Sequence, residues 1–238
     1  MNEHDSSTTG TLSIVATPIG NMGDITFRGL WNLKEAHAIY AEDTRVIAKL
    51  LAHYGLRTSV FRLDASTEVT KAKEIADRLE KGEHVVYVSD AGTPGVSDPG
   101  ARLVAYIREN LPEAKIDAIP GPSALTAALS IAGMTGDAFT FLGFLPHKKG
   151  RQTALKKIAT SEYTVVLYES PHRVIKLLSE IEKFIPNARV TIAREITKMH
   201  EEVLVGTPLE LADRLEKKKG VRGEFVVIIE IRSRSKTK

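Results

Sequence analysis

Three loops rich in glycine and proline carry residues well placed to bind a small molecule. They read TPIGNMGD at residues 17–24, SDAGTPGVSDPG at 89–100 and PGPSA at 120–124, and each follows a predicted strand. Ligands of open parallel sheets bind beyond the carboxyl ends of the strands, and glycine lets the backbone approach them closely. Each loop alone could be an ordinary turn. Three such loops at strand ends favour a ligand site.

The composition of these loops also indicates the kind of ligand. They contain neither the P-loop pattern nor the G-x-G-x-x-G dinucleotide fingerprint, and they contain no lysine or arginine, which disfavours a phosphate-rich cofactor. They carry instead Asp24, Asp90 and Asp98, whose carboxylates accept hydrogen bonds. The sequence therefore predicts a ligand that is cationic or carries hydroxyl groups.

Two polar clusters at strand-to-helix junctions are candidates for the reacting side of the site. The first contains Glu42, Asp43 and Arg45, and the second contains Glu169, His172 and Arg173. A carboxylate could accept a proton, and an arginine could hold a phosphate. The alternative is structural: Asp43 would cap its helix and pair with Arg45, and a serine would cap the helix after the second cluster.

Basic residues gather in the second half of the chain. The first run comprises Lys148, Lys149, Arg151, Lys156 and Lys157. The second, about sixty residues later, comprises Lys217, Lys218, Lys219 and Arg222, and the chain ends in RSRSKTK at 232–238. These runs could contact the phosphates of a structured RNA or could be solvated helix faces. Neither run is interleaved with aromatic residues, so a base-stacking platform is not indicated.

The overall composition excludes several kinds of chemistry. The 238 residues include no cysteine, which rules out disulfides, thiolate-bound zinc, iron–sulfur clusters and cysteine nucleophiles. The seven histidines lack metal-ligand spacing, so we expect no metal site, and the net charge of +3 is too small to identify a partner. No signal peptide and no apolar run near the ~18 residues of a membrane span is present, which predicts a cytoplasmic protein.

The predicted elements divide the chain into two parts. Strands and helices alternate over residues 12–120, which predicts a mainly parallel sheet, whereas residues 123–232 hold more strands than helices, which predicts a mixed sheet with antiparallel pairs. We therefore expect an α/β protein with domains at 12–120 and 123–232 and mobile tails at 1–11 and 233–238.

Capping residues predict where several helices begin. Asp43 is expected to cap one helix, Asp98 to cap another whose first residue is Pro99, and Ser170 to cap a third that begins with Pro171. A fourth helix, at 123–132, is apolar nearly all round and is expected to be buried.

Eight motifs, in order along nearly the whole chain, resemble the ribosomal RNA small subunit methyltransferase I family of the tetrapyrrole methylase superfamily. They are TPIGNMGDIT (17–26), AEDTR (41–45), SDAGTPGVSDPG (89–100), PGPSA (120–124), GFLPHKKGR (143–151), YESPHR (168–173), ARE-x-TK (193–198) and RGEFV (222–226). One departure is that the stretch LDASTE at 63–68 retains only Glu68 of a His-rich family motif that ends in Asn-Glu.

The resemblance implies two α/β domains with an active-site cleft between them, S-adenosylmethionine as cofactor, and a cytoplasmic homodimer. Its substrate would be 16S rRNA of the small ribosomal subunit, methylated on the ribose 2′-hydroxyl of a cytidine in the decoding region. The implied cofactor residues are Pro18, Gly20, Asp90, Ala91, Gly92, Pro94, Val96, Ser123, Ala124 and Tyr168.

For the reacting side, the two polar clusters supply Asp43, Arg45 and Glu169 as catalytic candidates. The candidates for RNA binding are Lys148, Lys149, Arg151, His172 and Arg173. Two other functions stay open at this point. One is a superfamily methylase acting on a tetrapyrrole or on a protein side chain, and the other is a non-catalytic RNA-binding or ribosome-assembly protein.

Overall fold

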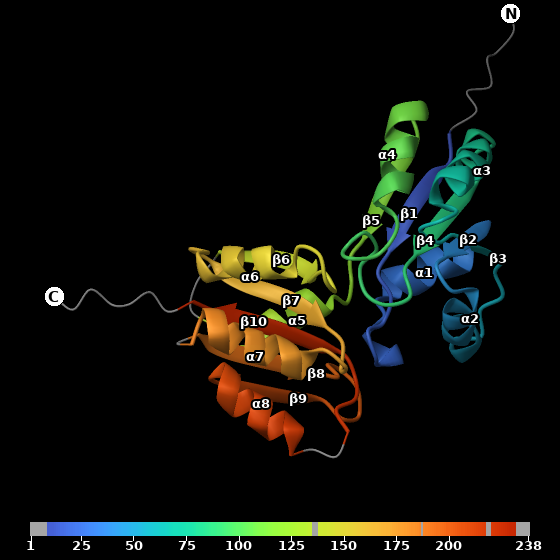
Figure 1. Ribbon diagram of the computed structural model, residues 1–238. Coiled ribbons are helices and arrows are strands. Elements are labelled where there is room, and N and C mark those ends of the chain that lie inside the picture. Colours follow the sequence, from blue (N-terminus) through green and yellow to red (C-terminus); the bar gives the residue numbers. More distant parts are fainter. Residues whose placement is uncertain (1–8, 135–137, 187, 218–219, 232–238) are drawn as a thin grey trace, which may run out of the picture. The chain divides into compact units, whose positions relative to one another are not determined.

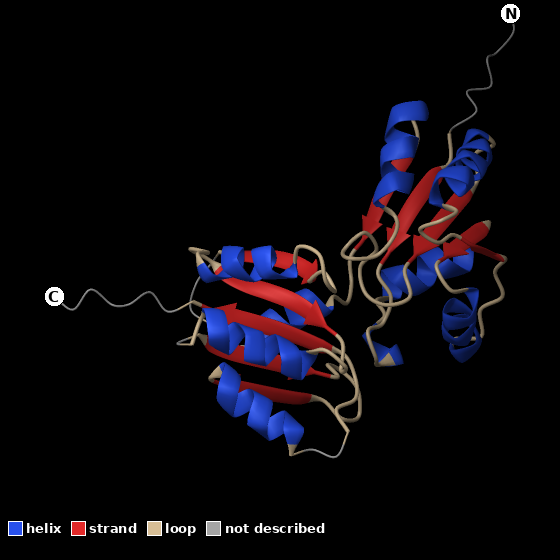
Figure 2. Ribbon diagram, in the orientation of Figure 1, coloured by secondary structure: helices blue, strands red, loops and turns tan. Residues whose placement is uncertain are grey.

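The computed structural model describes residues 9–134, 138–186, 188–217 and 220–231. The chain forms two compact units, Met1–Ser123 (unit 1) and Ala124–Lys238 (unit 2). Figure 1 labels their elements and Figure 2 shows that both units combine helices with a sheet. Unit 1 has an all-parallel sheet and unit 2 a mixed one, which confirms the predicted α/β class.

Unit 1 is built on a five-stranded sheet in the order β3-β2-β4-β1-β5. Its elements, in chain order, are β1 (Thr11–Val15), the 3-10 helix η1 (Met22–Asp24), α1 (Phe27–Glu35), β2 (Ala38–Ala41), α2 (Thr44–His53), β3 (Val60–Arg62), α3 (Glu68–Glu80), β4 (His84–Val88), α4 (Ala101–Asn110) and β5 (Lys115–Ile119). All four strand pairs are parallel.

Helices cover both faces of this sheet, so each strand is buried on two sides. In β4, Val85 and Tyr87 pack with α3 and α4, whereas Val86 and Val88 pack with α1 and α2. This alternation follows from the pleat of a strand, which directs successive side chains to opposite faces. It explains why the central strands read as continuous apolar runs.

Unit 2 has a five-stranded sheet in the order β6-β7-β10-β8-β9. Its elements are α5 (Ala124–Ile131), β6 (Phe139–Phe144), α6 (Arg151–Ala159), β7 (Thr164–Glu169), α7 (Val174–Phe184), β8 (Arg189–Arg194), β9 (Glu202–Gly206), α8 (Pro208–Glu216) and β10 (Phe225–Glu230). Among the described strands of unit 2, only β6 and β7 pair in parallel. Helices α6, α7 and α8 pack on one apolar core with the strands.

The structure corrects two predicted helix starts and one predicted burial. Helix α4 begins at Ala101 after Gly100, not at Pro99, and α7 begins at Val174, not at Pro171. Neither Gly100 nor the residue before α7 supplies a side-chain cap. In α5, Ala128 is the buried residue and Ile131 is 44% exposed, so this apolar helix is not enclosed. The α2 start is as predicted, because the Asp43 side chain accepts from the Arg45 backbone N–H.

Gly100 is a position where the fold requires glycine. Its φ is +124°, and a Cβ atom there would lie 2.6 Å from Tyr87 Cε1 in the core. We expect Gly100→Ala to lower the free energy of unfolding of unit 1 by about 2–4 kcal/mol, because backbone strain and overpacking add. Urea denaturation followed by fluorescence of the single tryptophan, Trp31 in α1, reports on this unit.

Gly55→Ala is the matched control for this substitution. Gly55 also has a positive φ, +66°, but a Cβ atom there has no neighbour within 4 Å. Gly55→Ala should therefore lower the free energy of unfolding only through backbone strain, by about 1 kcal/mol. Equal losses for the two variants would contradict the proposed clash with Tyr87.

Candidate functional site

The topology of unit 1 opens a crevice at the carboxyl end of β4. This strand lies between β1 and β2. The chain leaves β1 and β2 toward helices α1 and α2 on one face, but it leaves β4 toward α4 on the other face. Loops that diverge to opposite faces cannot fill the space between them, and ligands bind at such switch points.

A pocket lies at this place, entirely within unit 1. Its walls come from the loops that follow β1, β2 and β4 and from the first turns of α2; they are Thr17, Pro18, Gly20, Met22, Ala41, Asp43, Val46, Ile47, Leu50, Ser89 and Asp90. Four of the predicted site residues, Pro18, Gly20, Asp43 and Asp90, are among them. The apolar wall from α2 is a part that the sequence reasoning missed, although the Val46, Ile47 and Leu50 spacing marks one helix face.

Backbone and side-chain hydrogen bonds hold the three glycine- and proline-rich loops together. Thr17 and Gly92 exchange two backbone hydrogen bonds, with N···O distances of 2.9 and 3.0 Å. The Thr93 hydroxyl donates to the Pro122 carbonyl at 3.2 Å. The loop after β2 joins them, because the Asp43 backbone N–H donates to the Asp90 carboxylate at 2.9 Å. The structure therefore brings together loops that the sequence places up to about a hundred residues apart.

The other predicted residues of the 89–100 loop differ in accessibility. Gly92 and Pro94 are buried, Ala91 is exposed and Val96 is half-buried. Gly92 has a φ of +79°, a conformation that glycine adopts without strain. Ser123 ends unit 1, whereas Ala124 begins α5 in unit 2. Tyr168 lies on β7 in unit 2, where its ring makes edge contacts with Phe141 and Phe144.

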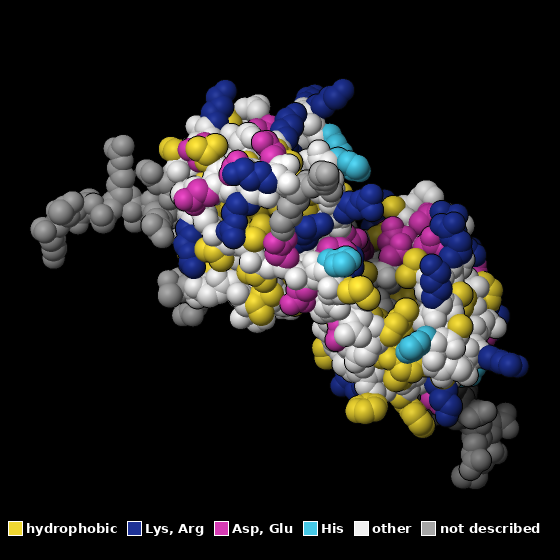
Figure 3. Space-filling model, turned by 90° about the horizontal axis from the view of Figure 1, so that it is seen from below, with side chains coloured by type: hydrophobic (Ala, Val, Ile, Leu, Met, Phe, Trp, Pro, Cys, Tyr) yellow, Lys and Arg dark blue, Asp and Glu magenta, His cyan; other side chains and the backbone are white. Residues whose placement is uncertain are grey.

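The chemistry of the pocket walls suits a ligand with positive charge and hydroxyl groups. Two carboxylates, Asp43 and Asp90, line it, and no lysine or arginine does. Carboxylates accept hydrogen bonds and stabilise a nearby cation, whereas phosphate groups would meet repulsion. Figure 3 shows one group of acidic side chains on unit 1, bordered by lysine and arginine side chains.

Asp43 is held in its charged form by its neighbour. Its carboxylate accepts from the Arg45 backbone and from the Arg45 guanidinium, with Nε···Oδ1 at 2.9 Å. These hydrogen bonds, with the Arg45 charge, lower the pKa of Asp43 to about 2. Asp43 is therefore a weak proton acceptor but a permanent negative charge at the pocket. The Arg45 side chain is 85% exposed and remains open to a partner.

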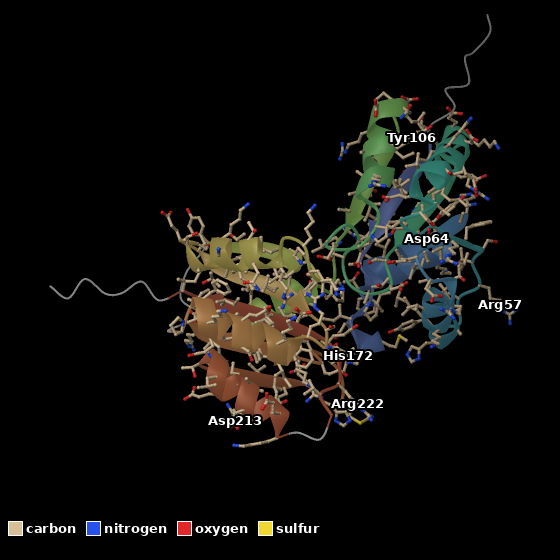
Figure 4. All side chains as sticks on the ribbon, in the orientation of Figure 1. Arg57, Asp64, Tyr106, His172, Asp213 and Arg222 are labelled. Carbon is tan, nitrogen blue, oxygen red and sulfur yellow. The ribbon has the colours of Figure 1, made fainter. Side chains whose placement is uncertain are left out.

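Other carboxylates near the same strand ends are destabilised as anions. Burial, followed by the charges of Asp90 and Asp98, raises the pKa of Glu42. Burial and Asp90 likewise raise the pKa of Asp98, against a hydrogen bond from Ser89 that lowers it. Asp64, which Figure 4 labels after β3, adds to the raised pKa of Glu42. This edge of unit 1 thus concentrates negative charge.

Glu68 lies at the first position of α3 and is 4% exposed. Its Oε1 atom accepts from the backbone N–H groups of Gly100, Arg102 and Leu103. Sequence reasoning missed this contact, because no local pattern links residues thirty-two or more positions apart.

The second polar cluster forms a buried ion-pair network in unit 2. The Glu169 side chain is fully enclosed, and its Oε1 atom lies 3.0 Å from Arg173 Nε. Arg151 Nη1 lies 3.8 Å from Glu169 Oε2, and Arg151 Nε donates to Glu180 at 2.8 Å. A direct catalytic role for Glu169 does not fit this enclosure, because a substrate hydroxyl cannot reach it.

The predicted role of Arg151 in RNA binding does not fit the structure for the same reason. Its side chain is only 5% exposed and is committed to carboxylates inside the unit, so it does not present its charge to RNA. Sequence reasoning grouped Arg151 with Lys148 and Lys149 by adjacency alone. The structure separates them, because both lysines lie in an exposed turn.

Arg173 connects the buried network to this basic turn. Its Nη2 atom donates to the Leu145 carbonyl at 2.7 Å, and its Nη1 atom lies 3.2 Å from His147 Nε2. His172 is exposed in the turn before α7 and is labelled in Figure 4 with Arg222. Both lie at one edge of unit 2, because Glu169 at the end of β7 pairs with Phe225 at the start of β10.

The remaining basic residues differ in their surroundings. Lys156 and Lys157 are exposed in the last turn of α6. Lys217 pairs with Asp213 at 2.6 Å. Lys218, Lys219 and the 232–238 segment lie outside the described residues.

The described residues contain neither a candidate membrane span nor a candidate metal-binding group. None of the helices there is long and apolar enough to cross a membrane. Within the same residues, no group of three or more His, Asp or Glu side chains is arranged to hold a metal ion.

Comparison with known proteins identifies the family. The family model described as Tetrapyrrole (Corrin/Porphyrin) Methylases matches residues 11–212. The chain belongs to this family. Within it, the chain is 43% identical to the Ribosomal RNA small subunit methyltransferase I of Xylella fastidiosa over 94% of this chain and 82% of the relative. It is 42% identical to that of Thermotoga maritima, over 92% of this chain and 98% of the relative.

These matches place the chain in the ribosomal RNA small subunit methyltransferase I family, a family of methyltransferase enzymes. A solved structure of uroporphyrin-III C-methyltransferase from Thermus thermophilus, complexed with S-adenosylhomocysteine, shares the fold. Its TM-score is 0.65 with 17% identity, and the match covers 93% of this chain and 98% of that chain.

Glu42 and Asp43, adjacent residues after β2, should affect stability with opposite signs. The raised pKa of Glu42 means that its ionised form destabilises folded unit 1 at neutral pH. Glu42→Gln should therefore raise the free energy of unfolding at pH 7. The gain should shrink as the pH falls through the raised pKa, where Glu42 becomes neutral in the folded state.

Asp43→Asn is the matched control. The pKa of about 2 at Asp43 means that its charge stabilises the folded state above the ordinary aspartate pKa, near ~3.9, and that this stability is lost as the pH falls toward 2. The variant should therefore be less stable than the wild type at pH 7. Trp31 fluorescence in urea at pH 4 and pH 7 measures both, and shifts of the same sign at pH 7 would contradict this account.

Proposed function

We propose that this protein transfers the methyl group of S-adenosylmethionine to the ribose 2′-hydroxyl of a cytidine in the decoding region of 16S rRNA. The observation that carries the proposal is the match, at 42–43% identity over more than nine-tenths of the chain, to proteins named Ribosomal RNA small subunit methyltransferase I. The pocket at the carboxyl end of β4 supports it, because its carboxylates suit a cationic, hydroxyl-bearing cofactor.

The residues that would hold the cofactor come mainly from the three loops of unit 1. They are Pro18, Gly20, Asp90, Ala91, Gly92, Pro94, Val96 and Ser123, with Ala124 and Tyr168 contributed by unit 2. Bound S-adenosylmethionine supplies a methyl group on a positively charged sulfonium. Backbone groups dominate this set, and the carboxylates of Asp43 and Asp90 offer negative charge and acceptors at the pocket wall.

The task of the protein in this reaction is alignment. Methyl transfer is an in-line displacement, so holding the attacking oxygen against the methyl carbon removes much of the barrier. Asp43 stays ionised through its contact with Arg45 and keeps that guanidinium in place. The exposed Arg45 is then the group that would hold an RNA phosphate near the pocket.

Unit 2 supplies the remaining RNA contacts in this proposal. Lys148, Lys149 and His172 are exposed, and Arg173 is partly accessible at 16%. Glu169 acts here as a positioning residue, because its ion pair orients Arg173, which in turn holds the backbone before the two lysines. We further propose that the protein works as a homodimer in the cytoplasm.

The direct test is nucleoside mass spectrometry of 16S rRNA from cells that lack this protein. We expect the 2′-O-methylated cytidine to disappear and to return when the wild-type chain is supplied. Unchanged methylation in the deletion strain would overturn the proposal. Methylation of a tetrapyrrole or a protein by the purified chain would instead favour the other superfamily functions.

The RNA surface can be tested separately with a charge reversal. The double variant Lys148→Glu/Lys149→Glu should raise the KM for RNA by about tenfold or more, because each lost phosphate contact weakens binding. The KM of the variant should also depend less steeply on salt concentration. The affinity for S-adenosylhomocysteine should not change.

Lys183→Glu is the control for this pair. This variant also replaces a lysine with glutamate. Lys183 lies in the last turn of α7, at the end of the helix that is remote from His172. Steady-state kinetics at two salt concentrations compares the variants. An unchanged KM for the double variant would remove Lys148 and Lys149 from the RNA surface.

A further inference from the structure

Helix α4 begins without a cap from its own sequence. Its N-cap residue is Gly100, not the predicted Asp98, and Gly100 has no side chain that could accept from the helix start. A side chain at Gly100 is excluded, because a Cβ atom would lie 2.6 Å from Tyr87 Cε1. The first N–H groups of a helix need acceptors, and so a buried helix start here needs one from elsewhere.

Glu68 supplies that acceptor from the start of α3. Its Oε1 atom accepts from Gly100 N at 2.9 Å, from Arg102 N at 2.9 Å and from Leu103 N at 3.0 Å. Three charge-assisted hydrogen bonds to one oxygen, in a residue that is 4% exposed, form a strong and rigid contact. The positive end of the α4 dipole also favours the carboxylate.

The helix start that Glu68 holds is also the end of the 89–100 loop. The opposite end of this loop is fixed by Thr17, whose hydroxyl donates to the Ser89 carbonyl at 3.3 Å and whose backbone pairs with Gly92. Near the α4 end, Gly95 N donates to the Pro99 carbonyl at 3.2 Å, which closes a turn directly before Gly100. The segment with Asp90, Gly92 and Pro94 is therefore held between two anchors.

We propose that Glu68 is a positioning residue for cofactor binding, acting through the 89–100 loop. The inference rests on the proposed function, because it takes this loop as part of the S-adenosylmethionine site. Glu68 does not line the pocket. Its carboxylate sets where α4 starts, and the start of α4 sets the conformation of the loop that carries Asp90.

Calorimetric titration of the full chain with S-adenosylhomocysteine tests this role. Glu68→Ala should weaken binding at least about tenfold, which corresponds to about 1.4 kcal/mol. Glu68→Gln should restore most of the affinity, because the amide carbonyl can still accept from the helix start. Thermal unfolding of each variant, measured in parallel, fixes a titration temperature at which all are folded.

Ile75→Val is the control that separates positioning from general stability. Ile75 is fully buried in the same helix, packs in the core and does not contribute a cap to α4. Its substitution should cost about 0.5–1.5 kcal/mol of stability, similar to the loss of a cap. We expect its affinity for S-adenosylhomocysteine to equal that of the wild type.

The outcomes distinguish the inference from the function on which it rests. Wild-type affinity in Glu68→Ala would reduce Glu68 to a stabilising residue and overturn the inference. If Glu68→Ala does not fold, Glu68→Asp takes its place, because the shorter carboxylate cannot reach all three N–H groups. Wild-type affinity of Glu68→Asp for S-adenosylhomocysteine would likewise overturn the inference. Absence of binding by the wild type would contradict the proposed function itself.

Discussion

The position of β4 between β1 and β2 is the constraint on which the rest of this structure depends. Parallel pairing places the carboxyl ends of all three strands at one edge of the sheet. The helices that follow them lie on different faces, so the loops diverge and leave a pocket. The paired backbone of Thr17 and Gly92 then fixes the two largest loops against each other. Without this strand order, the glycine- and proline-rich segments would be separate turns.

Electrostatics gives this edge its chemical character. Carboxylates are concentrated there at a cost, because burial and mutual repulsion raise the pKa of Glu42 and Asp98. Asp43 avoids this cost by pairing with Arg45. The Glu68 carboxylate accepts three backbone hydrogen bonds from the start of α4. A site that keeps negative charge near neutral pH despite the repulsion is well matched to a cationic ligand, such as the sulfonium of the proposed cofactor.

Local sequence patterns predicted the features that depend on local physics. The alternation of strands and helices gave the fold class, and Asp43 caps α2 as expected because an N-cap needs only its own helix start. The three loops meet because the carboxyl ends of parallel strands share an edge. These features accounted for the pocket residues Pro18, Gly20, Asp43 and Asp90.

Long-range contacts explain where local patterns failed. Asp98 has the residue type of a cap, but Tyr87 excludes a side chain at Gly100 and Glu68 supplies the acceptor from another helix. Arg151 stands beside two exposed lysines in sequence, yet Glu169 and Glu180 draw it into the interior. In each case the partner lies between thirteen and thirty-five residues away, beyond the reach of any helical or strand periodicity.

In the function proposed above, the crevice at the end of β4 binds the methyl donor. The most direct measurement is a crystal structure of this chain with S-adenosylhomocysteine. We expect density for the ligand against residues 17–20 and 89–96, with the Asp90 carboxylate accepting a hydrogen bond from it. Ligand density elsewhere, with these two loops free of contacts, would contradict the account.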